Sequence, residues 1–237
     1  MYLMYYYPYY FDPTYILVII GVILSLLASG KVKTTFSKYS KVLSRSGLTG
    51  AQTAERILRN AGIYDVHIER ISGDLNDHYD PRSKTLRLSD SVYNKTSVAA
   101  IGVAAHECGH AIQHDHGYIP LKLRGAIVPV ANFGATMSWP IILIGLFLGG
   151  SQTLITFGII LFSASVAFQI ITLPVELNAS KRAVRILDDT GILAESEIKG
   201  TKKVLTAAAL TYVAGAAASI LQLLRLVLLF GGRRRDD

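Results

Sequence analysis

The segment His106-Glu107-Cys108-Gly109-His110 lies near the middle of this 237-residue chain. In an α-helix with 3.6 residues per turn, two residues four positions apart share one face and lie about 6 Å apart along the axis. Both imidazoles can therefore bind a single metal ion, and histidine nitrogen is a common zinc ligand. A glutamate directly after the first histidine completes the pattern typical of zinc peptidases. We expect one Zn²⁺ ion per chain, bound by His106 and His110.

The same pattern predicts a catalytic role for Glu107. A bound zinc ion lowers the pKa of water and polarises a peptide carbonyl. A carboxylate beside the metal can accept the proton of the attacking water and later pass it to the leaving amine. The residues therefore indicate peptide hydrolysis. Cys108 lies off the histidine face, and we expect it to serve packing.

The alternative is that two ordinary histidines share a solvated helical face. The surrounding residues 97–114, SVAAIGVAAHECGHAIQH, argue against this alternative, because they hold no charged side chain besides Glu107 before the end of the helix. Thr96 or Ser97 can cap the start of such a helix, and Gly117 follows its end. These features favour a buried helix that carries a metal site.

The composition predicts an α-helical integral membrane protein. The chain is 51% hydrophobic and only 17% charged, with a mean hydropathy of +0.36, which is too apolar for an ordinary soluble domain. Residues 125–175 hold no charged side chain and can form two spans joined by a turn at 149–152. A first span is expected at Tyr15–Ser29, and a fourth apolar run covers Val204–Phe230, broken only by Arg225. We therefore expect about four transmembrane helices, with the zinc helix leading into the second.

The placement of basic residues predicts the orientation. No lysine or arginine precedes Lys31, whereas five basic residues lie between Lys31 and Arg45. Cytoplasmic loops carry such an excess, so we expect an N-terminus outside and residues 31–125 in the cytoplasm. The tyrosine-rich Met1–Tyr10 suits an interfacial belt. Arg233–Arg235 would end outside if residues 204–230 cross, so that segment either crosses against the rule, which we favour, or lies partly in the membrane plane.

Attraction between basic side chains and anionic lipid headgroups explains the net charge of +7. The basic residues gather where spans end, and no basic groove with interleaved aromatic residues is present, so we expect no nucleic-acid partner. A single cysteine excludes an internal disulfide.

A small α+β part is expected between the first span and the zinc helix. Thr49 and Gln52 form a capping box at the start of a short amphipathic helix. Period-two alternation predicts strands at 66–71 and 85–89, on either side of a loop at 72–83. An edge strand beside a zinc helix can bind an extended substrate through its main chain. We assign this role to Thr85, Leu86, Arg87 and Leu88; the alternative is a plain supporting strand.

A catalytic zinc needs a third protein ligand. His116 fits the metzincin spacing His-Glu-x-x-His-x-x-Gly-x-x-His, but Gln113 stands where that pattern needs glycine. Glu176 follows the third span, and two spans joined by a tight turn return the chain to the face of the membrane from which it left. We favour Glu176; the alternative for this residue is an interfacial carboxylate paired with Lys181 or Arg182.

Several segments together resemble the bacterial YugP-type membrane zinc metallopeptidases, from about Lys31 to Arg225. They are Asp77-His78-Tyr79-Asp80-Pro81, Leu88-Ser89, residues 103–113 around the histidines, Leu173-Pro174-Val175-Glu176 and Ala207–Val213. More distantly, the order of strand, zinc helix, two spans and Glu-x-x-Ala is similar to the HtpX heat-shock proteases and the CAAX prenyl proteases.

The distant resemblance implies that Glu176 is the third zinc ligand, because those proteases use the glutamate of a Glu-x-x-Ala-Asp motif. This chain departs from the motif at Ser180, where they carry aspartate, so another group must orient His106 or His110. Such gluzincin sites also add a His, Tyr or Arg donor for the oxyanion. The sequence does not choose among four candidates: His78, Tyr79, Arg182 and Tyr212. His78 has the best position, and its alternative role is a turn built on Asp80 and Pro81.

We therefore expect a gluzincin-like zinc endopeptidase of the bacterial cell membrane with a cytoplasmic active site, acting on membrane or membrane-proximal proteins. The alternatives are a catalytically inactive zinc-binding scaffold or adaptor, which a closed fourth ligand would indicate, and a metal carrier, which should hold ionisable residues inside its spans. An oligomer or an accessory membrane partner is left open. The expected regions are 1–30 with the first span, 31–125 with the peptidase part, 126–173 with the hairpin of spans, 174–203 as a cytoplasmic helix with the third ligand, and 204–237 with the fourth helix and basic tail.

Overall fold

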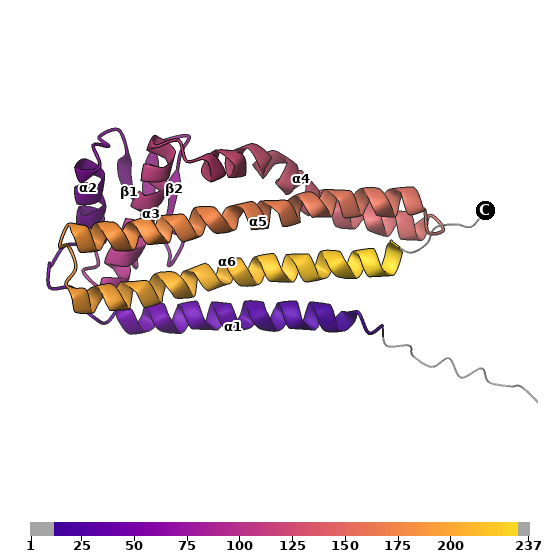
Figure 1. Cartoon of the computed structure of the whole chain (residues 1–237), viewed down its shortest axis with the longest axis horizontal. Coiled ribbons are helices and arrows are strands. Elements are labelled where there is room, and N and C mark those ends of the chain that lie inside the picture. Colours follow the sequence, from indigo (N-terminus) through magenta and orange to yellow (C-terminus); the bar gives the residue numbers. More distant parts are fainter. Residues whose placement is uncertain (1–11, 232–237) are drawn as a thin grey trace, which may run out of the picture.

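The computed structural model describes residues 12–231. This part of the chain is mostly helical, with one small sheet at one end of a long bundle (Figure 1). The predicted roles of Met1–Tyr10 and Arg233–Arg235 lie outside the described residues. The elements, in chain order, are α1 (Tyr15–Tyr39), α2 (Gly50–Asn60), β1 (His67–Ile71), β2 (His78–Asp80), β3 (Thr85–Ser89), α3 (Val98–Asp115), α4 (Ile119–Phe147), α5 (Gln152–Asp189) and α6 (Glu195–Phe230).

Four of these helices, α1, α4, α5 and α6, are long and apolar enough to cross a membrane. Many of their large apolar side chains are exposed, as expected where lipid replaces water as the neighbour. In Figure 1, α1, α5 and α6 run side by side along the long axis, while α2, α3 and the sheet gather at one end. The expectation of about four spans, with the zinc helix leading into the second, agrees with this arrangement, since only residues 116–118 separate α3 from α4.

The helices α1 and α5 extend well beyond the predicted spans. The first span was expected to end at Ser29, but α1 continues to Tyr39, because residues 30–39 hold no proline to stop a helix. The predicted cytoplasmic helix at 174–203 is not a single helix: α5 runs on to Asp189, a short turn follows, and α6 begins at Glu195. At about 1.5 Å per residue, the 38 residues of α5 measure about 57 Å, so α5 is longer than the roughly 30 Å of a bilayer core.

The hairpin between α4 and α5 is tight. Residues 148–151 separate the two helices, and Gly149 and Gly150 both have positive φ, which confirms the predicted turn. Gly134 brings α4 close to α5, because a Cβ there would lie 2.2 Å from the carbonyl oxygen of Leu161. Pro129 and Pro140 lie inside α4, and its first turns diverge from α5 before the two helices join (Figure 1).

An ion pair joins the segment just before α1 to the C-terminal part of α6. Arg225 donates to Asp12 at 3.3 Å and to the Thr14 hydroxyl at 3.2 Å, and its guanidinium lies over the ring of Tyr15. The charge that interrupts the last apolar run is therefore paired at one end of the bundle, and α6 extends along the whole of α1 (Figure 1).

The sheet corrects one prediction. The strand at 85–89 is confirmed as β3, but it is the central strand: the order is β1-β3-β2, with β1 parallel and β2 antiparallel to it. Its main chain is therefore paired on both sides, and the prediction that it is an edge strand open to substrate is wrong. The sequence missed β2, which covers only three residues of the predicted loop.

The zinc helix α3 lies at the centre of the folded part. Ser97 caps it by accepting from the Ala100 N–H, and Gly117 follows it with a φ of +62°. Most of its residues are buried between α2 and the sheet on one side and α5 and α6 on the other. The predicted capping box of Thr49 and Gln52 is present at the start of α2. Cys108 packs in this core, with its Sγ 3.6 Å from the Ala54 carbonyl.

Candidate metal centre

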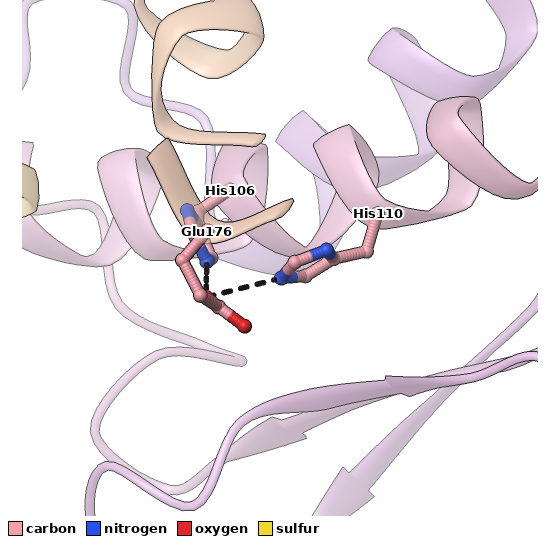
Figure 2. Close-up of side chains that lie close together, drawn as sticks. All are labelled: His106, His110 and Glu176. Atoms are coloured by element: carbon pink, nitrogen blue, oxygen red, sulfur yellow. Dashed lines mark ion pairs between the residues drawn. The ribbon is translucent and has the colours of Figure 1, made fainter. Parts of the chain in front are cut away.

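The structure brings His106, His110 and Glu176 together, with one ligand atom of each within 4.8 Å of the others. Glu176 Oε2 lies 3.3 Å from His106 Nε2 and 3.5 Å from His110 Nε2. Figure 2 shows the two imidazoles of α3 facing the carboxylate of α5. A tetrahedral site with ligand distances of about 2.1 Å has edges of about 3.4 Å. The spacing therefore suits one zinc ion.

Close contact between α3 and α5 makes this spacing possible. Gly109, between the two histidines, packs against the backbone of Ala179, and a Cβ there would lie only 2.7 Å from the Ala179 carbonyl oxygen. Any larger residue would push the helices apart. The glycine in the motif thus positions both histidines against the turn of α5 that carries Glu176.

The hydrogen bonds at the far side of each ring leave the Nε2 atoms to face the carboxylate. His106 Nδ1 lies 3.1 Å from the Ser180 hydroxyl, and His110 Nδ1 lies 3.0 Å from Gln113 Oε1. An amide oxygen only accepts, so Nδ1 of neutral His110 carries the hydrogen and its Nε2 presents a lone pair.

Glu176 Oε2 is buried without a hydrogen-bond donor. Among the described residues, neutral His110 Nε2 therefore points a lone pair at a carboxylate oxygen that lacks a proton. Two such groups repel each other unless a proton or a metal ion lies between them. The donor set, two imidazoles and one carboxylate, is one that zinc prefers in catalytic sites. The residues present thus fit a zinc ion.

The second oxygen of Glu176 is held by α4. Arg124 donates to Oε1 at 3.2 Å. Glu176 is only 2% exposed, and the guanidinium compensates the charge of its buried carboxylate. The alternative pairing of Glu176 with Lys181 or Arg182 is wrong for Arg182, whose Nε donates instead to Asn178. His116, the other candidate ligand, is the exposed C-cap of α3 and lies near Asp115, outside the group of three.

A cavity of about 480 Å³ opens in front of the three ligands. Glu107 lines it and is 7% exposed, and Tyr212 of α6 lines it too. The first turns of α4 cover one side through Leu121, Gly125 and Val128. The cavity therefore holds the predicted base and three of the four predicted oxyanion donors, His78, Tyr79 and Tyr212, next to the metal group; Arg182 is not among its lining residues.

The loop and strand around β2 form the opposite wall of this cavity. Asp77, His78 and Tyr79 all line it. Asp77 accepts from the Ser89 backbone N–H at 2.7 Å and from the Ser89 hydroxyl at 3.0 Å, which ties the start of β2 to β3. Burial raises the pKa of this carboxyl, and the charge of Glu107 raises it further. Asp77 and Glu107 thus place two further carboxyl groups in the cavity that the metal ligands line.

The other predicted oxyanion donors have partners of their own. His78 Nδ1 lies 2.9 Å from the Asn76 carbonyl, and the Tyr79 hydroxyl lies 2.9 Å from His114 Nδ1, one helical turn beyond His110. Burial raises the pKa of Tyr79 to about 12, so this phenol stays protonated. The turn predicted after His78 is present, because Asp80 accepts from the Arg82 N–H and the Ser83 hydroxyl.

Three functional contacts were missed from the sequence. No role was predicted for Arg124, which stands directly before the charge-free run. Gln113 was interpreted as the residue that replaces the metzincin glycine, and Ser180 as a departure from a motif. Arg124 and Ser180 contact ligand residues on other helices, whereas Gln113 contacts His110 within α3. The contact of Gln113 had a local signal, since Gln113 follows His110 by three residues on the same helix, and Ser180 follows Glu176 by one helical turn.

Comparisons with known proteins identify the family of this chain. Residues 14–231 match the model of a protein family described as "Putative neutral zinc metallopeptidase". The chain is 52% identical over 214 residues to a protein of Bacillus subtilis (strain 168) named "Putative membrane protease YugP", a match that covers 90% of this chain and 95% of that protein. No solved structure matches the chain.

Proposed function

Since the chain belongs to this neutral zinc metallopeptidase family, we propose that it is a membrane-embedded, zinc-dependent endopeptidase of the gluzincin type. Its substrates are membrane proteins or the membrane-proximal segments of proteins. The observation that carries the proposal is the convergence of His106, His110 and Glu176 on one point beside Glu107 in an open cavity.

His106, His110 and Glu176 would hold the zinc ion, which supplies Lewis-acid chemistry when bound: it acidifies water and polarises a carbonyl. Glu107 accepts the proton of the attacking water and returns it to the leaving nitrogen. Tyr212 and Arg124 line the same cavity, and hydrogen-bond donors of these types can stabilise negative charge on the carbonyl oxygen. Arg124 also donates to Glu176 Oε1 at 3.2 Å and so compensates the charge of this carboxylate.

The substrate strand is reassigned from β3 to β2. Among the described residues, β2 is paired only on the side of β3, and its residues line the cavity. An extended peptide can pair with this free edge and place a carbonyl over the ligands. The contact between Tyr79 and His114 fixes β2 on the zinc helix, so the strand and the metal keep a constant separation.

The depth of the site supports substrates at the membrane surface. Glu176 lies 24 residues beyond Gln152, the start of α5, which corresponds to about 36 Å along the helix and so to the far edge of a bilayer core. The apolar wall supplied by Val128 leads from the cavity towards the span. Basic residues in the last turns of α1 and directly after it favour the cytoplasmic side for this end.

The scaffold alternative requires a closed metal site. In the part of the chain that the structure describes, the group holds three ligand residues, and a fourth His, Cys, Asp or Glu is absent from it. The test is capture: the Glu107→Gln protein, expressed in a bacterial membrane, should retain uncleaved substrates, which mass spectrometry identifies. The matched control is Glu55→Gln, an exposed change on α2. Identical co-purifying proteins in both preparations would contradict the proposal.

A further inference from the structure

Gln113 lies at the centre of a hydrogen-bond chain that links both helices of the metal centre. Its side chain is completely buried. Its Oε1 is 3.0 Å from His110 Nδ1, and its Nε2 donates to the Val175 carbonyl at 2.8 Å and to Asn178 Oδ1 at 3.0 Å. One amide thus connects a ligand of α3 to the residue directly before Glu176.

The chemistry of the partners allows only one orientation of this amide. A backbone carbonyl such as that of Val175 only accepts hydrogen bonds, so the NH₂ group of Gln113 must face it. The oxygen of Gln113 then faces His110, and an amide oxygen only accepts. His110 Nδ1 must therefore donate, and in the neutral ring Nε2, which faces Glu176, carries the lone pair.

A second anchor reinforces this orientation from outside the site. Arg182 Nε donates to Asn178 Oδ1 at 2.8 Å. Arginine stays protonated and can only donate, so it turns the oxygen of Asn178 towards itself and towards Gln113. The direction of each hydrogen bond from Arg182 to His110 is therefore fixed by a residue that does not touch the metal group.

We propose that Gln113 is a positioning residue that holds His110 in the tautomer competent for metal binding and sets the register of α3 against Glu176, with Asn178 and Arg182 as its outer support. This inference rests on the proposed zinc site. Histidine ligands are commonly fixed by an acceptor on the second ring nitrogen, and loss of such a partner lowers metal affinity roughly 10- to 100-fold. Here the acceptor is a neutral amide whose orientation is fixed from the adjacent ligand helix.

The test measures zinc affinity of the full-length protein in detergent by competition with a chromogenic chelator. Gln113→Met keeps the length of the side chain but removes both the acceptor and the donor, and should weaken zinc binding about 10- to 100-fold. The control is Thr201→Val, a buried change that alters the contact of α3 with α6 away from the ligands and should leave zinc affinity within twofold. Unchanged affinity in Gln113→Met, or an equal loss in Thr201→Val, would overturn the proposal.

A second pair of variants applies even if Gln113→Met does not fold. Arg182→Met and Lys181→Met remove the same charge from adjacent positions of α5. Arg182→Met should weaken zinc binding several-fold and alter the visible absorption of the Co²⁺-loaded protein, whereas Lys181→Met should change neither. If the two variants bind zinc with the same affinity and show the same absorption, Asn178 and Arg182 do not support Gln113. His106→Ala tests the zinc site separately from the role of Gln113. This variant should lose zinc binding, and if it binds zinc as the native protein does, the proposed site itself is wrong.

Discussion

His106 Nδ1 and the Ser180 hydroxyl lie 3.1 Å apart, although 74 residues separate them in the chain. The hydroxyl occupies the position at which HtpX-like and CAAX-type proteases carry aspartate, and it contacts the ring that the aspartate would be expected to orient. Both proposed histidine ligands therefore have neutral outer partners, serine for His106 and glutamine for His110.

Replacement of Ser180 tests this contact. Ser180→Ala removes the partner of His106 Nδ1, and zinc affinity should fall about 10-fold, at the low end of the effects of outer partners. Ser180→Asp supplies a stronger acceptor and should restore affinity to at least the native value. Chelator competition measures both, with Ser163→Ala, a partly exposed serine of the same helix, as the control. Native affinity in Ser180→Ala would refute the role of the hydroxyl.

The third ligand can be tested directly. Glu176→Gln removes the anionic oxygen and should lower zinc affinity by more than the roughly 10- to 100-fold expected for an outer partner. His116→Ala should leave the metal content unchanged, because this side chain lies outside the group of three. Metal analysis of the two purified proteins checks the pair. Zinc lost from His116→Ala and kept in Glu176→Gln would indicate a metzincin-like site instead.

Close packing at Gly109 predicts a loss of stability. A Cβ at this position would lie 2.7 Å from a backbone oxygen of α5, so Gly109→Ala should destabilise the fold by about 1–3 kcal/mol. Gly30→Ala is the matched control, since a helical Cβ there meets no atom within 4 Å. Thermal unfolding in detergent should show a lower Tm for Gly109→Ala alone. A Tm equal to that of Gly30→Ala would show that the helices tolerate the methyl group.

Orientation in the membrane can be measured with cysteine labelling. The native Cys108 is buried, and burial raises the pKa of its thiol, so it should not react. A cysteine at the exposed Ser83 should be protected from an impermeant thiol reagent in intact cells, whereas one at Ser151, in the turn at the other end of the bundle, should be labelled. The opposite pattern would place the site outside the cytoplasm.

The sequence predicted those features that depend on local pattern. The charge-free run of 125–175, the caps of α2 and α3 and the two histidines four apart all carry their signal within a few residues. The strand order could not be predicted in this way, because β2 has only three residues and its pairing with β3 is a tertiary contact. The contacts of Gln113 with Val175 and of Arg124 with Glu176 are equally non-local, since these partners lie more than 50 residues away in sequence.

Peptide hydrolysis through Glu107 is the central claim, and new peptide N-termini measure it most directly. Membranes from cells that lack the protein are incubated with the purified, zinc-loaded native protein or with Glu107→Gln, and the N-termini are identified by mass spectrometry. The native protein should generate a set of new N-termini near membrane surfaces. Glu107→Gln should bind zinc equally and generate them roughly 10²- to 10⁴-fold more slowly, because only the general base is removed. The same N-termini at an undiminished rate from Glu107→Gln, or none from the native protein, would contradict the account.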